Sequence, residues 1–105
     1  MEQPNKFYID SLSDGDLDFE NKLIEIIKKE FPEEKKVYLN NINGKKYKLA
    51  ADNVHKLKHK ISIFGLEKGY RTAVVFENNL LKGSTELKEE FEATLTTITT
   101  YLKQL

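Results

Sequence analysis

The sequence predicts an all-α fold, an up-down-up-down four-helix bundle with a short extra N-terminal helix. Apolar residues recur three and four positions apart over long stretches, which is the spacing of one face of an α-helix. Short turns rich in Gly, Asn, Asp and Ser separate these stretches, and short connections favour antiparallel neighbouring helices. The 105 residues suffice for one hydrophobic core, so we expect a single domain over residues 1–105.

The first half of the chain holds a short helical segment and a longer one that we expect to be interrupted. Residues 6–12 can form a turn or two of helix, and residues 13–16 form a turn that offers several N-caps. The next segment is amphipathic up to Phe31, but Pro32 lacks an amide proton and disfavours helical conformation in the residue before it. We therefore predict a break or kink there, and a second helical piece over residues 33–42. The residues expected to face the core are Phe19, Leu23, Ile26, Ile27, Phe31, Val37, Tyr38 and Ile42.

The second half contains three amphipathic segments. Residues 47–64 form the clearest helix, because their apolar residues alternate three and four apart over about five turns. A further helix is expected over residues 68–81, and residues 82–84 should close it and cap the last helix, residues 85–104. The residues expected to face the core are Tyr47, Ala50, Val54, Leu57, Ile61, Phe64, Ala73, Phe76, Leu80, Leu87, Phe91, Leu95, Ile98 and Leu102, with Tyr70, Val74 and Leu81 beside them.

Composition narrows the class of protein. Hydrophobic residues make up 39% and charged residues 32% of the chain, as in soluble globular domains. No apolar run approaches the roughly 20 residues that a membrane helix needs, and residues 1–6 lack the apolar core of a signal peptide. With no cysteine, disulfides and thiol chemistry are excluded, and we expect a cytoplasmic protein. Seventeen basic and seventeen acidic residues cancel, so overall charge gives no support for nucleic-acid binding.

One face of the helix over residues 47–64 gathers positive charge around a histidine. At about 100° per residue, His55 points roughly 130° away from the apolar seam, so its imidazole should be exposed. Asp52 is the only acidic residue between positions 45 and 62, which also contain six lysines. Such a surface suits an anionic group or an acidic partner, although a charge run can also be just the solvated side of a helix. The neighbours of His55 on this face, three, four or seven positions away, are Lys48, Ala51, Asp52, Lys58, His59 and Ser62.

The stretch from Val54 to Leu66 resembles the signature of histidine phosphotransfer (HPt) domains. That signature has an aliphatic residue two positions after a histidine, Lys three after it, and a Gly-aliphatic pair ten and eleven after it. The positions in register here are His55, Leu57, Lys58, Gly65 and Leu66. The surroundings are also similar, with an upstream helix ending in Phe31, apolar residues before Glu77, and a final amphipathic helix. The resemblance covers about residues 15–104.

The resemblance implies a role in a two-component phosphorelay. His55 would accept a phosphoryl group from an aspartyl phosphate on one receiver domain and pass it to another, while Lys58, as an exposed charge, would steady the phosphoryl oxygens. The partners would be receiver domains of a hybrid histidine kinase or response regulator, with Mg²⁺ bound by the receiver and no cofactor on this chain. The chain would be a monomeric phosphocarrier and not a stand-alone enzyme. The expected partner-binding residues are Lys48, Ala51, Asp52, Lys56, His59 and Ser62.

Two positions depart from the family pattern and leave alternatives open. His59 replaces the glycine that usually follows the phosphoacceptor by four residues, and Lys60-Ile61 replaces smaller residues. Ile61 belongs to the apolar seam, and Lys60 is expected only to add charge. Three other functions remain: an HPt-like adaptor that binds receivers without phosphorylation, a helical bundle with an unrelated surface role, and a metal site at His55 and His59. The lysines around the two histidines disfavour a cation.

Overall fold

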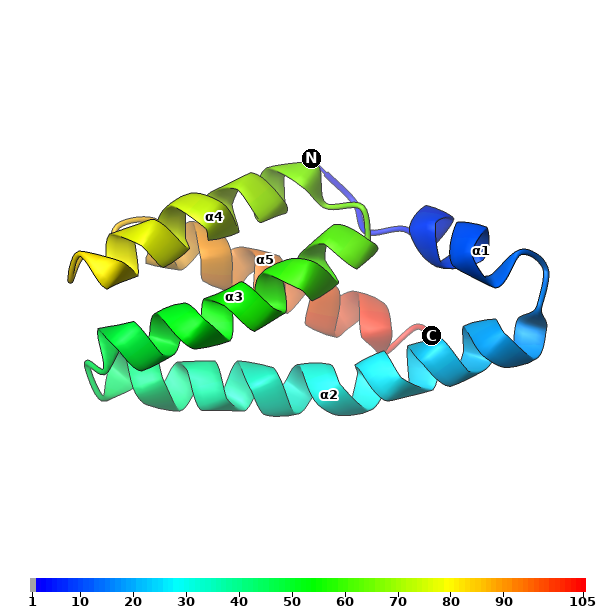
Figure 1. The fold of residues 1–105 in the computed structure, drawn as a ribbon, viewed down its shortest axis with the longest axis horizontal. Helices are drawn as coiled ribbons and strands as arrows, with labels where there is room; N and C mark the ends of the chain where they lie inside the picture. The colour runs from blue at the N-terminus through cyan, green and yellow to red at the C-terminus, as the bar shows by residue number, and fades with distance from the viewer. Residues whose placement is uncertain (1) are drawn as a thin grey trace.

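A computed structural model describes residues 2–105, which form five α-helices without a β-strand (Figure 1). The predicted all-α class is therefore confirmed for this part of the chain, and Met1, which the single-domain prediction includes, lies outside it. Among residues 2–105, no helix combines the length and apolar character that a bilayer crossing requires. The helices are α1 (Phe7–Ser13), α2 (Leu17–Asn43), α3 (Tyr47–Ile63), α4 (Glu67–Leu81) and α5 (Lys88–Leu102).

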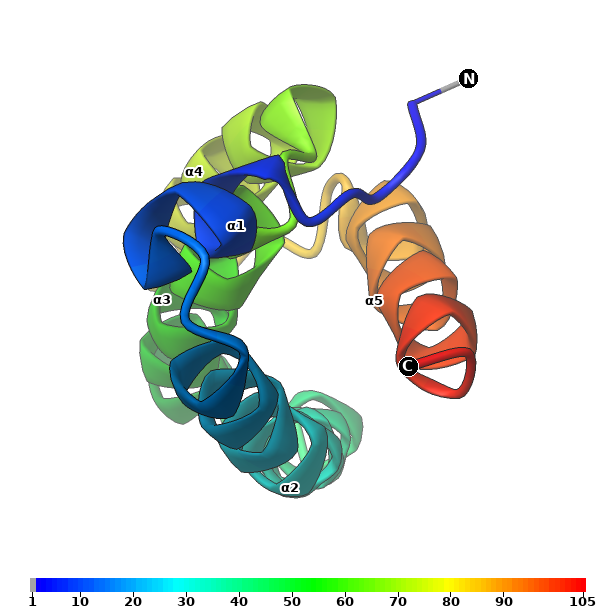
Figure 2. The ribbon, with the colours of Figure 1, turned by 90° about the vertical axis from the view of Figure 1, so that its right-hand side faces the viewer.

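The helix α3 has the most extensive packing, against α4 on one flank and α2 on the other. The helix α5 packs on α4 and touches α2 at few points. Viewed along the helices, α3 lies between α2 and α4, and α5 lies on the opposite side of the molecule from α3 (Figure 2). The short helix α1 packs against α2 and lies beyond the ends of α3 and α4 (Figure 1).

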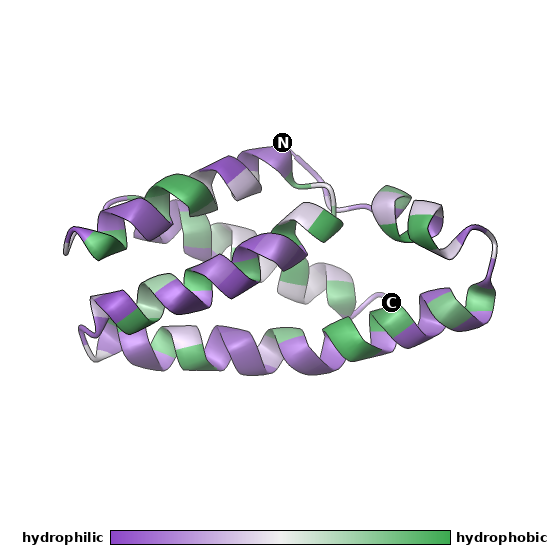
Figure 3. Cartoon of the chain, viewed as in Figure 1, coloured by the Kyte–Doolittle hydropathy of each residue, from purple (hydrophilic) through white to green (hydrophobic). Residues whose placement is uncertain are grey.

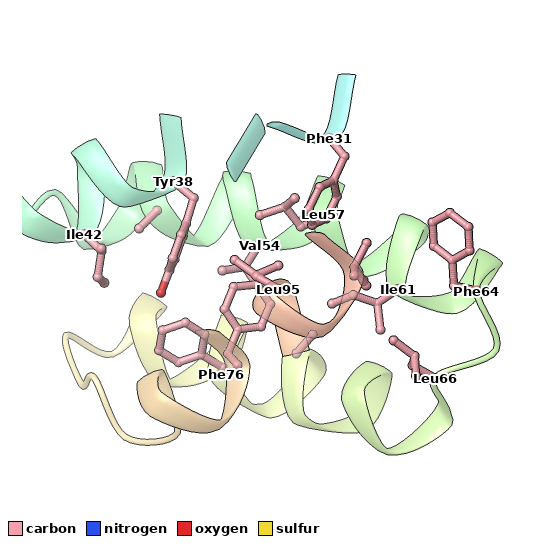
Figure 4. Close-up of a cluster of buried hydrophobic side chains, with 14 of the residues drawn as sticks. Phe31, Tyr38, Ile42, Val54, Leu57, Ile61, Phe64, Leu66, Phe76 and Leu95 are labelled. Carbon is pink, nitrogen blue, oxygen red and sulfur yellow. The ribbon is translucent and has the colours of Figure 1, made fainter. Parts of the chain in front are cut away.

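The core consists of the apolar faces of all five helices. Green hydrophobic residues recur at intervals along each helix between purple hydrophilic ones (Figure 3), and those turned inward meet in one cluster (Figure 4). The seam predicted for α3 is confirmed, because Val54, Leu57, Ile61 and Phe64 are fully buried. Members predicted on the later helices and also buried are Ala73, Phe76, Leu80, Phe91, Leu95, Ile98 and Leu102.

A buried tyrosine ties α2 to α5. The Tyr38 ring packs edge-on against Phe91 at 5.2 Å and Phe76 at 6.3 Å between ring centroids. Its hydroxyl donates a hydrogen bond of 2.9 Å to Glu92 Oε2, which satisfies a polar group inside the core. Burial raises the pKa of the Tyr38 hydroxyl, and the carboxylate of Glu92 raises it further.

The break predicted at Pro32, with a separate helical piece over residues 33–42, is wrong, because α2 runs continuously from Leu17 to Asn43. Proline removes one backbone hydrogen bond, the one to the carbonyl of Lys28. Pro32 lies on the exposed side of the helix, where water can solvate that carbonyl. The buried positions Ile27, Phe31, Tyr38 and Ile42 stay in helical phase across the proline, so tertiary packing outweighs the local penalty.

Three residues predicted to face the core are about half exposed: Phe19 47%, Ile26 48% and Val37 46%. Leu81, which was expected beside the core residues of its helix, is 55% exposed. Ile26 and Val37 directly precede the buried Ile27 and Tyr38, and one residue of rotation, about 100°, turns them to the edge of the packed face. An amphipathic pattern therefore locates the centre of a buried stripe better than its edges.

The last helix begins at Lys88, three residues later than predicted, and Ser84 does not cap it. The Ser84 hydroxyl accepts instead from the amide of Glu86, whose carbonyl accepts from the Asn79 side chain. These bonds hold a non-helical loop, and Leu87 precedes the helix with a left-handed φ of 76°. Side-chain hydrogen bonds to the backbone thus compete with the first helical turn here.

Gly65, one of the positions that match the HPt signature, has a structural role at the end of α3. Its φ is +75°, a left-handed conformation that favours glycine, and a side chain there would collide with Asn5, 2.6 Å from an ideal Cβ. The amide of Asn5 also donates to the carbonyl of Phe64 at 2.9 Å. The glycine therefore ends α3 and lets the N-terminal segment approach it.

Candidate functional site

His55 lies in the middle of α3, and its side chain is 55% exposed. The opposite side of the helix is fixed by the fully buried Val54 and Leu57, which leaves little freedom to rotate α3 about its axis. The exposed mid-helix position predicted for this histidine is confirmed. The core thus presents the imidazole to solvent on a rigid element.

One nitrogen of this imidazole is hydrogen-bonded to Glu77 on α4. The Nδ1 atom of His55 lies 3.1 Å from Glu77 Oε2 and 3.4 Å from Oε1. A carboxylate can only accept hydrogen bonds, so this contact assigns the proton of the neutral ring to Nδ1. The Nε2 atom then carries the lone pair, and an imidazole with a lone pair on nitrogen is a nucleophile at neutral pH without a strong base nearby.

Lys58 shares the same carboxylate, at 3.0 Å between its Nζ atom and Glu77 Oε1. Its side chain is only 12% exposed, so the prediction of a freely exposed charge is wrong. The difference has a physical reason: Lys58 lies on the flank of α3 that faces α4, where its alkyl chain is covered and its ammonium reaches an acceptor. Glu77 therefore binds both His55 and Lys58, which places all three groups in one cluster.

Ala51 was expected among the partner-binding residues, and the structure contradicts this, since Ala51 is 2% exposed. It lies two turns before Lys58 on the same flank of α3, and its methyl group is too short to extend past the neighbouring helix. The other residues expected on this surface are exposed, namely Lys48, Asp52, Lys56, His59 and Ser62.

Lys60 does more than add charge. Its ammonium lies 2.9 Å from Glu34 Oε2 and 3.3 Å from Glu30 Oε1, both on α2. These contacts join α3 to α2 and partly neutralise the lysine. The exposed positive charge near His55 is thus smaller than the lysine count suggests, and it rests mainly on Lys48 and Lys56.

His59 lies directly beside His55, with 5.2 Å between the ring centroids and an edge-on angle of 88°. It is exposed, so a partner that reaches His55 also meets the second imidazole. Among residues 2–105, no group of three or more His, Cys, Asp or Glu side chains is placed to hold a metal ion. The histidine pair on its own therefore offers at most two ligands.

The site residue that sequence reasoning missed is Glu77, which was noted only as the end of an apolar stretch. Helical periodicity predicts that it lies beside the core, next to Phe76, but does not say which residue of α3 it meets. That pairing depends on how far α4 is shifted along α3, which the pattern of either helix alone does not contain.

We compared the chain with known protein families, curated proteins and solved structures, and none of them matched.

Proposed function

We propose that this chain is a histidine phosphotransfer domain whose phosphoacceptor is His55, with α2 to α5 forming an up-down-up-down bundle. The observation that carries the proposal is the environment of the two nitrogens of one exposed ring. Nδ1 is bound to Glu77 at 3.1 Å, and the ring projects from a fixed helix with 55% of its side chain exposed. This arrangement supplies a nucleophile that another protein can reach.

The proposed reaction is a phosphoryl exchange between two side chains. The Nε2 lone pair attacks the phosphorus of an aspartyl phosphate on a receiver domain, an N–P bond forms, and the P–O bond to the aspartate breaks. The aspartate leaves as a carboxylate, and the Nδ1 proton stays on the ring. The ring gains positive charge as the bond forms, and the carboxylate of Glu77 stabilises that charge. The reverse sequence passes the group to a second receiver.

Lys58 has a complementary role in this proposal. Its ammonium lies one helical turn from His55 and is held at 3.0 Å from Glu77. A phosphoryl group on Nε2 adds negative charge nearby, which competes with Glu77 for the ammonium. Glu77 would therefore restrain Lys58 before transfer and share it afterwards.

The partner would be a receiver domain with an acidic pocket. The exposed residues Lys48, Lys56 and His59 surround the ring. The two lysines offer the opposite charge, and His59 offers a ring N–H as a hydrogen-bond donor. Receiver domains supply the Mg²⁺ and most of the catalytic groups in such exchanges, so this chain would act as carrier and co-substrate.

The test is phosphoryl acceptance with a small donor and with receivers. We expect phosphoramidate, and phosphorylated receiver domains, to add one phosphoryl group that is labile to acid and stable to base, detected by intact mass and ³¹P NMR. His55→Gln should abolish acceptance, and His59→Gln should retain it as the matched control. Acceptance by His55→Gln at the wild-type rate would exclude His55, and absence of any acceptance by the wild-type chain would leave the phosphorylation-independent adaptor.

A further inference from the structure

A groove lies between α2 and α5, two helices that make few contacts with each other. Its volume is about 400 Å³, which lies within the range of small-molecule sites. The floor is apolar and includes Phe31 and Leu39 from α2 and Leu102 from α5. The groove shares no residue with the cluster of His55, Lys58 and Glu77 on α3 and α4.

The rim of this groove is positively charged. Four lysines line it and no acidic residue does. Across residues 2–105, none of the four forms an ion pair with a carboxylate, although the chain as a whole has a net charge of zero. The four lysines are Lys28, Lys35, Lys36 and Lys103.

One of these lysines also bridges the two helices. Lys35 Nζ donates to Thr99 Oγ1 at 2.9 Å, which links α2 to α5 across the groove. The other three are exposed, with free donors beside an apolar surface. An apolar floor with cationic groups at its edge complements a molecule that has an apolar body and a negative group.

The groove extends along α2. From Lys28 to Asn40 the helix rises about 18 Å, and both residues line the groove. Phe31 and Leu102 are only 1% and 5% exposed, so most of their surface is already packed in the core. A partner helix would need a broad apolar stripe, whereas an alkyl chain can be covered by the smaller apolar surface available here.

We propose that the α2–α5 groove binds a small anionic amphiphile of the fatty-acid class. Its alkyl chain would lie along Phe31, Leu39 and Leu102, and its carboxylate would be bound by the rim lysines. The ligand would add one charged partner to lysines that have none, and it would cover the apolar surface that Leu39 and Pro32 still expose in the groove.

The experiment titrates the full-length chain with sodium dodecanoate below its micelle concentration, by calorimetry and ¹H–¹⁵N NMR. We expect saturable binding of one molecule, with shifts concentrated at residues 28–40 and 99–103. Dodecyltrimethylammonium has the same alkyl chain and the opposite charge, and should bind at least about tenfold more weakly, since a charge-assisted hydrogen bond contributes that much. His55→Gln should bind dodecanoate like the wild type, so this test is independent of the phosphotransfer proposal.

Single variants distinguish the contribution of the rim lysines from that of the shape of the groove to dodecanoate binding. Lys36→Gln and Lys103→Gln should each weaken dodecanoate binding, and at least one of them by about tenfold. Lys82→Gln replaces an exposed lysine at the end of α4, outside the groove, and is the matched control that should leave dodecanoate affinity unchanged. Leu39→Trp should fill the groove and abolish binding, and the exposed lysine variants keep the test valid if that substitution disturbs folding.

Several results would overturn the proposal. These are no saturable binding, equal affinity for the cationic amphiphile, affinity unchanged in both lysine variants, or shifts that map outside α2 and α5. A dimer in analytical ultracentrifugation that Leu39→Trp dissociates would assign the groove to a second copy of the chain instead.

Discussion

Glu77 should be the most sensitive single position of the proposed site, because one carboxylate binds two groups on the neighbouring helix. In Glu77→Ala, the Lys58 ammonium loses its acceptor at 3.0 Å while its side chain is only 12% exposed. Hydrogen bonds to charged groups contribute about 1.5–3 kcal/mol. The contact to His55, whose side chain is 55% exposed, adds less than about 1 kcal/mol.

Since the lysine can partly turn toward water, we expect Glu77→Ala to lower the free energy of unfolding by about 1.5–2 kcal/mol. Guanidinium denaturation followed by circular dichroism measures this. Glu67→Ala removes an exposed acid from the same helix and should cost less than about 0.5 kcal/mol. A double-mutant cycle with Lys58→Ala should give a coupling energy of about 1 kcal/mol or more, because the two residues are in direct contact.

The same substitution should also slow phosphoryl acceptance. The ring of His55 would lose its Nδ1 partner, and with it the fixed tautomer and the negative charge that stabilises the attacking ring. One charge-assisted hydrogen bond of about 1.5 kcal/mol corresponds to about tenfold in rate. Glu77→Gln keeps an acceptor for Nδ1 and should fall between the wild type and Glu77→Ala. If Glu77→Ala accepts phosphate at the wild-type rate and keeps its stability, Glu77 is a surface side chain and the proposed role is wrong.

Four further predictions follow from the same structure. Leu57→Ala should lower the free energy of unfolding by about 2–5 kcal/mol, because Leu57 is fully buried, and a loss below 1 kcal/mol in denaturant titration would contradict the assigned core. Pro32→Ala should raise that free energy by about 1–3 kcal/mol, since it restores a backbone hydrogen bond inside a continuous helix. If the variant is less stable in the same titration, Pro32 does not destabilise α2 and the reasoning is wrong. His59→Gly should cost about 1 kcal/mol of stability, keep His55 phosphorylation and widen the range of receivers that serve as donors, whereas an unchanged donor profile would make His59 passive. Tyr38 has a pKa raised above its ordinary value of 10.0, so this tyrosine ionises in the unfolded chain before it does in the folded one, and stability falls as the pH rises above about 10. This alkaline loss of stability should shrink in Tyr38→Phe but not in the exposed control Tyr8→Phe.

The sequence was sufficient to predict the helices and the centre of each buried face, because periodicity depends on local geometry alone. It failed at Pro32, where the local penalty of proline was outweighed by packing on both sides of it. It also failed at Ser84, where a favourable capping residue bonds to a loop instead. In both cases the deciding contacts come from outside the segment considered.

In the candidate site, too, features that depend on one helix were predicted and features that depend on two helices were not. The exposure of His55 follows from its angle to the apolar seam of its own helix, so the sequence predicted it. The pairing of His55 and Lys58 with Glu77, and the burial of Ala51, depend on the shift and rotation of α4 against α3. No periodicity within one helix contains that information. A single seam can therefore direct a histidine to solvent, but the second helix determines which of its nitrogens is left free. Substitutions in the α3–α4 contact, such as those that shift Phe76 beside Glu77, should accordingly affect the chemistry of His55 more than changes on the exposed face of α3.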